Sequence, residues 1–154
     1  MTTPQEWVEL PVTQDDINYA HYYKQVVDEN NGVGGQYFIE KDSWEGFLVE
    51  FAAEKIFPNA QSGRTVNGHD VYDYKWNSHI VDVKGGLAVN IQQYVKKVTV
   101  DIYVFGKLIG DKVLIYGWLT RDEVGRCRKK IKTAKYEPYY NIKVRQLHSI
   151  KELA

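Results

Sequence analysis

Residues 73–84 read Asp-Tyr-Lys-Trp-Asn-Ser-His-Ile-Val-Asp-Val-Lys, and this stretch decides the expected fold. Two strand-like runs meet at Asn77-Ser78, a pair that suits a two-residue hairpin loop. With that loop, Trp76 faces His79 and Asp73 faces Asp82 across the hairpin. Because strand residues alternate between faces, Lys84 shares the face of these two aspartates. The other face is expected to pack on the core and carries Tyr72, Tyr74, Val81 and Val83.

The two opposed aspartates indicate a cation site. Directly opposed side chains have Cβ atoms about 5 Å apart, and like charges at that separation destabilise a sheet. A hard divalent cation such as Mg²⁺ removes the conflict, because it binds carboxylates, water and phosphate oxygens. Lys84 would then orient the attacking water or stabilise a charged phosphate. The alternative is a solvated strand face whose aspartates are neutralised by Lys75 and Lys84, and one extra residue in the turn would break the pairing.

The rest of the chain predicts helices first and strands afterwards. Thr13 and Asp16 form a capping pattern for a helix of about 14–29, and a second helix of about 43–57 ends before Pro58. A third, short helix is capped at Thr120. Strands are expected at 70–76, 79–84, about 98–106, 112–118 and near 139–146, with a polar loop at 58–69. The 154 residues suit one domain, 1–154, of the α/β class with an α+β-like order of elements.

Composition and charge exclude several classes of protein. The single cysteine, Cys127, excludes an internal disulfide and a cysteine-rich zinc site, and the reducing cytoplasm is the expected location (the host cytoplasm if the protein is viral). No apolar run approaches the ~18 residues of a membrane span, and no secretory signal is visible. The sequence contains no zinc-ligand spacing, phosphate-binding loop or serine-hydrolase elbow. The formal net charge is zero, but residues 1–50 carry −8 and residues 119–154 carry +6.

The aspartate and lysine pattern resembles the PD-(D/E)xK nuclease superfamily. Asp82-Val83-Lys84 matches its Asp/Glu-x-Lys element, Asp73 matches the preceding acid, and Gly46-x-x-x-Glu50 resembles its helix element. The later apolar strands look like the core strands of small phage-type members, so the resemblance covers roughly residues 13–120. It implies a restriction-endonuclease-like central mixed β-sheet flanked by helices.

The same resemblance implies a Mg²⁺-dependent deoxyribonuclease, with Mn²⁺ able to replace Mg²⁺. Asp73, Asp82 and Glu50 would hold the metal together with the backbone carbonyl of Val83, and Lys84 would complete the catalytic set. We expect an endonuclease, although the sequence does not separate internal cleavage from cleavage at ends, nor duplex from branched or single-stranded DNA. DNA is the expected partner, with no membrane and no small-molecule cofactor. A two-fold homodimer would suit such cleavage, but no feature demonstrates one.

Some residues depart from the family pattern or have rivals. Tyr72 stands where the family has proline, and Asp82 replaces the commoner glutamate. Asp70 competes with Asp73 for the first acid, and a bulge near Val71 would favour Asp70. For Glu50 the alternative is a surface charge. Glu45 fits a helix-capping role better than a metal site. Gln92 and Gln93 follow the motif and are candidates for positioning substrate, with a polar loop as the alternative.

A basic cluster near the C-terminus is the candidate DNA-binding surface. Lysine and arginine contacts to phosphates supply most nonspecific DNA affinity. The candidates are Arg126, Arg128, Lys129, Lys130 and Lys132, together with Lys96 and Lys97. Nearby tyrosines, Tyr136, Tyr139 and Tyr140, could stack on unpaired bases. A solvated basic loop is the alternative. Two rival functions remain: a catalytically inactive nucleic-acid-binding or assembly module, and a small α+β protein with no nucleic-acid role.

Overall fold

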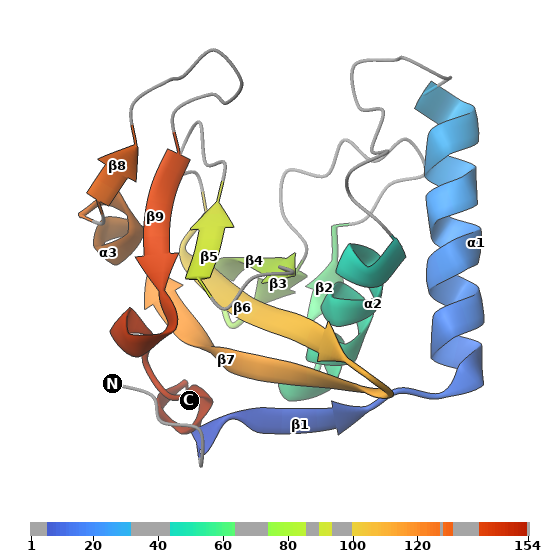
Figure 1. Cartoon of the computed structure of the whole chain (residues 1–154), viewed down its shortest axis with the longest axis horizontal. Helices are drawn as coiled ribbons and strands as arrows, with labels where there is room; N and C mark the ends of the chain where they lie inside the picture. The colour runs from blue at the N-terminus through green and yellow to red at the C-terminus, as the bar shows by residue number, and fades with distance from the viewer. Residues whose placement is uncertain are drawn as a thin grey trace.

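The chain forms an α/β structure around a six-stranded mixed sheet (Figure 1). The computed structural model describes residues 6–31, 44–63, 74–85, 90–93, 100–126, 128–130 and 139–153. The strand order is β1-β7-β6-β4-β3-β2. The bounds are β1 Val8–Pro11, β2 Gln61–Ser62, β3 Tyr74–Trp76, β4 His79–Gly85, β6 Ile102–Ile109 and β7 Lys112–Thr120. The α/β expectation is confirmed at this level of description.

Local capping explains where α1 begins. Helix α1 spans Gln14–Asn31. The backbone N–H of Thr13 donates to the Asp16 carboxylate over 2.9 Å, and the Asp16 N–H donates to the Thr13 hydroxyl over 3.1 Å. This reciprocal pair satisfies two N–H groups that the first helical turn leaves without partners. The predicted start at Thr13 is therefore confirmed. The hydrogen bond from the Thr13 N–H also lowers the pKa of the Asp16 carboxyl below its ordinary value.

The β3–β4 hairpin has the predicted register as far as the structure describes it. Tyr74 pairs with Val81, and Trp76 pairs with His79. Asn77 and Ser78 have φ of 46° and 67°, and positive φ at both central residues is typical of the type I′ turn that joins two-residue hairpins. The expected loop of two residues is thus confirmed.

Two cores lie on opposite faces of the central sheet. Helix α2, Trp44–Ala53, packs through Val49 on the face that carries Val81 and Val83. Tyr103 and Phe105 of β6 lie in a separate buried cluster. Since β4 and β6 are parallel, with Asp82 beside Tyr103, this second cluster marks the opposite face. Helix α1 then covers α2 through contacts that include Ala20, Tyr23, Leu48 and Phe51.

A small sheet of order β5-β9-β8 stands beside the central one (Figure 1). Its strands are β5 Asn90–Gln93, β8 Arg128–Lys130 and β9 Tyr139–Lys143. Ile142 of β9 is fully buried in the same cluster as Tyr103 and Phe105. The small sheet therefore packs on the face of the central sheet that α2 leaves uncovered. The polar-loop alternative for Gln92 and Gln93 and the loop alternative for Arg128–Lys130 are wrong, because both segments are strands paired with β9.

Several predicted boundaries also change. The second helix is α-helical only to Ala53 and continues as the 3₁₀ turn Glu54–Ile56. The strand expected at 98–106 begins at Ile102 and runs to Ile109. The late strand ends at Lys143 and is followed by the 3₁₀ turns η3 Val144–Gln146 and η4 Ile150–Glu152. The short helix α3, Arg121–Gly125, is confirmed with its capping box. No helix in the described part of the chain is both long and apolar enough to cross a membrane.

Candidate functional site

Asp82 and Lys84 form the described part of the predicted site. They stand two residues apart on β4 and share one face, and Lys84 Nζ lies 2.7 Å from Asp82 Oδ2. Their side chains are 18% and 33% exposed, so the ion pair is partly shielded yet reachable from solvent. Their neighbours on β6, Tyr103 and Phe105, are buried. The expectation that the lysine and the aspartate share a face is confirmed.

The acid opposite Asp82 falls outside the described residues. This applies to Asp73 and equally to its rival, Asp70. Within the residues that the structure describes, histidine, cysteine and acidic side chains nowhere form a group of three or more that could hold a metal ion. A nearby acid, Asp101, has a structural role, because its carboxylate accepts a 2.8 Å hydrogen bond from the Ile80 N–H where β4 begins. The Asp73–Asp82 pairing therefore stays a prediction.

Glu50 lies on the other side of the central sheet from Asp82. It is 5% exposed, on α2, and its backbone carbonyl accepts a hydrogen bond from the Tyr74 hydroxyl. Helix α2 approaches the end of β4 closely because residue 85 is glycine. A Cβ at Gly85 would lie 3.3 Å from both the Gly46 Cα and the Val49 Cβ. The surface-charge alternative for Glu50 is wrong, because the residue is buried. Its helix nonetheless covers the face opposite the one that carries Asp82 and Lys84.

The remaining predicted residues divide into three groups. Val83 is buried within the β4–β6 ladder. Arg126 is exposed at the end of α3, and Arg128, Lys129, Lys130, Gln92 and Gln93 belong to the small sheet. Lys96, Lys97 and Lys132 lie outside the described residues. The register of β9 aligns both peripheral strands, with Asn141 paired to Gln92 on one side and to Arg128 on the other. The predicted glutamine and basic segments are thus brought into one sheet.

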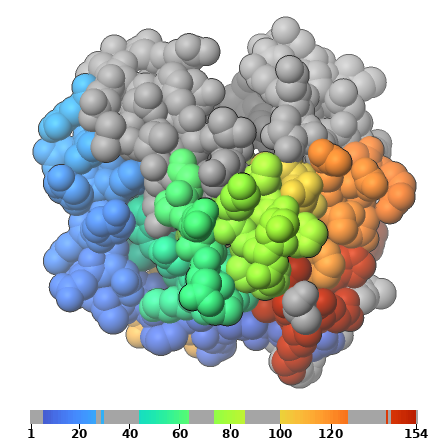
Figure 2. All heavy atoms as spheres, turned by 180° about the vertical axis from the view of Figure 1, so that it is seen from behind, coloured from blue at the N-terminus to red at the C-terminus, as the bar shows by residue number. Residues whose placement is uncertain are grey.

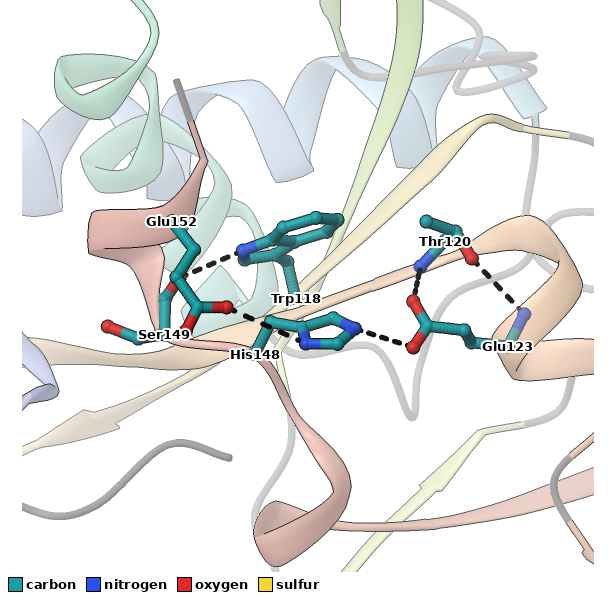
Figure 3. A network of polar contacts seen from close by, with 6 residues as sticks. All are labelled: Trp118, Thr120, Glu123, His148, Ser149 and Glu152. Carbon is teal, nitrogen blue, oxygen red and sulfur yellow. Dashed lines mark hydrogen bonds and ion pairs between the residues drawn. The ribbon is translucent and has the colours of Figure 1, made fainter.

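Sequence reasoning missed a polar network at the C-terminal segment (Figure 3). Glu123 accepts a 3.0 Å hydrogen bond from the Thr120 N–H through Oε1, and its Oε2 lies 2.5 Å from His148 Nε2. The other ring nitrogen, Nδ1, lies 3.7 Å from Glu152 Oε2. The Trp118 indole donates to the Ser149 carbonyl over 2.9 Å. The capping pattern at Thr120 was visible in the sequence, but the partner of Glu123 on a distant segment was not.

This network controls the ionisation of Glu123. Partial burial by itself raises the pKa of the Glu123 carboxyl, but hydrogen bonds from Thr120 and the His148 ring outweigh it and hold the pKa below the ordinary value. Glu123 therefore stays ionised well below neutral pH. A shallow depression beside it is lined by Leu119, Glu123, Arg126 and Gln146.

Exchanging Glu123 for glutamine should reduce the acid sensitivity of folding. The lowered pKa means that the Glu123 carboxylate stabilises the fold fully above the ordinary value of 4.5, and that this contribution is lost as the pH falls through the folded value. Glutamine keeps an acceptor for the Thr120 N–H but does not titrate. Urea unfolding at neutral pH and at about pH 3 should show a smaller difference in Glu123→Gln than in wild type. If both proteins lose the same stability between neutral pH and pH ~3, this role is contradicted. Glu152→Gln is the control, because the Glu152 side chain is 57% exposed.

Comparisons with protein-family models, curated proteins and solved structures find no match to this chain. The family resemblance therefore depends on the residues themselves. What the structure adds is the shared face of Asp82 and Lys84, their ion pair and the tight turn that precedes them.

Proposed function

We propose that this chain is a metal-dependent deoxyribonuclease with a restriction-endonuclease-like core. The observation that carries the proposal is the Asp82–Lys84 pair on β4, which follows a two-residue turn with the expected Tyr74–Val81 register. The mixed sheet with a parallel β4–β6 pair, and a helix packed against it, also supports this fold.

The residues present suit Mg²⁺ chemistry. Asp82 offers carboxylate oxygens, which are the ligands that Mg²⁺ prefers, on a face that solvent reaches. Asp73 and the Val83 carbonyl are the proposed further ligands; Glu50 is not among them, because α2 covers the opposite face of the sheet. A bound ion would supply charge stabilisation at the scissile phosphate and activation of the attacking water.

The chain's own residues would divide the remaining tasks. Asp82 would bind the ion. The β4–β6 ladder sets its position, because Asp82 pairs there with the buried Tyr103. A cation bound to the Asp82 carboxylate would displace the Lys84 ammonium group from it. Lys84 would then interact with the phosphate oxygens or the attacking water. Both are partly shielded, so the charges interact more strongly than they would in bulk water.

A cleavage assay on linear, circular and branched DNA tests the proposal. We expect products with Mg²⁺ or Mn²⁺ and none with EDTA, because the phosphate charge and the attacking water both require the ion. Cleavage of the circular DNA would identify an endonuclease, and cleavage of linear DNA alone would identify an exonuclease. Products that persist in EDTA, or no product with either metal, would overturn the proposal.

A second candidate is a nucleic-acid-binding or assembly module without catalysis. Two observations favour it: Lys84 already neutralises Asp82, and Glu50 lies across the sheet from both. This candidate predicts DNA binding that survives both chelation and Asp82→Asn. A metal-dependent cleavage product would exclude it.

A further inference from the structure

The depression beside Glu123 brings together side chains of opposite charge. Glu123 of α3 and Arg126, which caps that helix, line it together with Gln146 of η3 and the buried Leu119 of β7. Arg126 and Gln146 are exposed, so a ligand reaches them directly from solvent. The depression has a volume of about 200 Å³. Sites for drug-sized ligands enclose roughly 300–1,000 Å³, so this one suits a smaller group.

The Glu123 carboxylate is held in place by the fold itself. Its Oε1 accepts from the Thr120 N–H over 3.0 Å, and its Oε2 lies 2.5 Å from His148 Nε2 (Figure 3). The lowered pKa of Glu123 keeps the group ionised at neutral pH. An ionised carboxylate has about four acceptor positions, more than these two contacts use. Glu123 therefore presents a fixed negative acceptor to the depression.

A ligand for this pair of charges offers acceptors to Arg126 and donors to Glu123. A phosphate group offers acceptors only, and the carboxylate would repel it. Guanine offers both kinds of group: the acceptors O6 and N7 lie side by side, and the donors N1–H and the 2-amino group follow them. Arginine binds O6 and N7 of guanine through two hydrogen bonds, the commonest specific contact to a DNA base. A carboxylate complements the two donors.

The depression lies on the same side of the central sheet as Asp82. Asp82 pairs with Tyr103, and Tyr103 pairs with Leu119, so the three residues form one row across β4, β6 and β7. Directly paired residues share a face of the sheet. Neighbouring strands lie about 4.8 Å apart, which separates Asp82 from Leu119 by about 10 Å along this row. A DNA strand rises about 3.4 Å per nucleotide, so roughly three nucleotides cover that distance.

The charge of the surrounding surface favours a nucleic acid over a neutral partner. Figure 2 shows the end of β7 with α3 (orange) and the C-terminal segment (red) at one edge of the molecule, opposite α1 (blue). Residues 119–154 carry ten Lys/Arg and four Asp/Glu. Helix α1 carries four acidic residues against one lysine. An uneven field of this kind steers a polyanion toward the basic edge and away from the acidic one.

We propose that the depression formed by Leu119, Glu123, Arg126 and Gln146 binds an unstacked guanine base of DNA. This inference rests on the proposed nuclease function and gives it a base specificity. Arg126 donates to O6 and N7 of the base, and Glu123 accepts from N1–H and the 2-amino group. Because a duplex uses N1–H in the base pair, the guanine belongs to single-stranded DNA or is turned out of the duplex.

Binding of oligothymidine strands that carry one different central base tests the site. Short fluorescent strands with guanine, adenine, cytosine or thymine at the centre are titrated with protein in EDTA, so that no cleavage occurs. Wild type should bind the guanine strand on the order of 10-fold more tightly than the others, the discrimination given by one bidentate pair. Hypoxanthine lacks the 2-amino group and 7-deazaguanine lacks N7, so each should lose part of the preference.

Two conservative variants should remove the preference through different contacts. Lysine keeps the charge but lacks the planar fork, so Arg126→Lys should bind the all-thymine strand like wild type without preferring guanine. Glu123→Gln should bind the guanine and hypoxanthine strands equally, because the 2-amino group has lost its carboxylate partner. Arg121→Ala is the matched control: it removes an exposed cation from the same helix but outside the depression, and it should keep the preference.

Urea unfolding of each variant shows whether the fold is intact. Arg126→Lys changes an exposed residue, so it decides the question alone if Glu123→Gln is unstable. The site is wrong if wild type binds no strand, if it prefers another base or none, or if Arg126→Lys keeps the preference. Cleavage is measured independently: a guanine preference that depends on Arg126 supports the site even when wild type fails to cut, and that failure overturns only the nuclease proposal.

Discussion

Lys84→Ala should lower DNA cleavage on the order of 10²–10³-fold, the usual cost of removing one positioned charge from a developing anion. In the structure, Lys84 Nζ lies 2.7 Å from Asp82 Oδ2, and the lysine side chain is one-third exposed. It is therefore positioned to interact with a phosphate that approaches the same carboxylate. The measurement is the initial rate of cleavage of a plasmid at saturating Mg²⁺.

A comparison with Asp82→Asn separates the two roles. The amide has the shape of the carboxylate but no charge, so this variant should lose both cleavage and Mg²⁺ binding. Lys84→Ala should lose cleavage only, and its Mg²⁺ affinity should equal or exceed that of wild type, because no ammonium group then competes for Asp82. Titration calorimetry with Mg²⁺ measures that affinity.

Lys112→Ala is the matched control for Lys84→Ala. Lys112 forms an ion pair with Glu9 over 3.4 Å, on the paired strands β7 and β1, and both side chains are exposed. Exposed ion pairs contribute roughly 0–1 kcal/mol to stability, so this variant should fold and cut like wild type. If Lys84→Ala cuts DNA as fast as Lys112→Ala, Lys84 is not catalytic.

Gly117→Ala should destabilise the fold by about 3 kcal/mol, the upper part of the usual range for overpacking a closed site. Gly117 has φ of +156°, and a Cβ there would lie 2.3 Å from the His148 carbonyl oxygen and 2.8 Å from the Leu147 Cβ. The first obstacle is backbone, so it cannot rotate away as a side chain can. The C-terminal segment would have to separate from β7.

The contacts around Gly117 explain why that separation is costly. Trp118 exchanges two backbone hydrogen bonds with His148, of 3.1 and 2.9 Å, and Leu147 is fully buried. Urea unfolding should show the loss as a lower midpoint. Gly125→Ala is the control, since a Cβ at Gly125 meets no atom within 4 Å and alanine is a better helix former. Equal midpoints for Gly117→Ala and wild type would contradict the close packing.

The predictable parts of the site are those set by neighbouring residues. The Asn77-Ser78 turn sets the hairpin register, and that register together with strand alternation places Asp82 and Lys84 on one face. The assignment of Glu50 was less successful. Its position near an apolar helical stripe predicted a place at a sheet margin, but which face of the sheet α2 covers depends on contacts between distant segments, such as the approach of Gly85 to Gly46.

The sequence by itself determined the hairpin turn, the capping of α1 by Thr13 and Asp16, and the capping box at Thr120. In each case the interacting groups lie within four residues of one another, so little chain entropy opposes their contact. Only the tertiary structure decided that β5 and β8 are strands and that His148 reaches Glu123. Those short polar segments have no strong local preference, and their conformation comes from partners such as β9, which is itself held by the burial of Ile142.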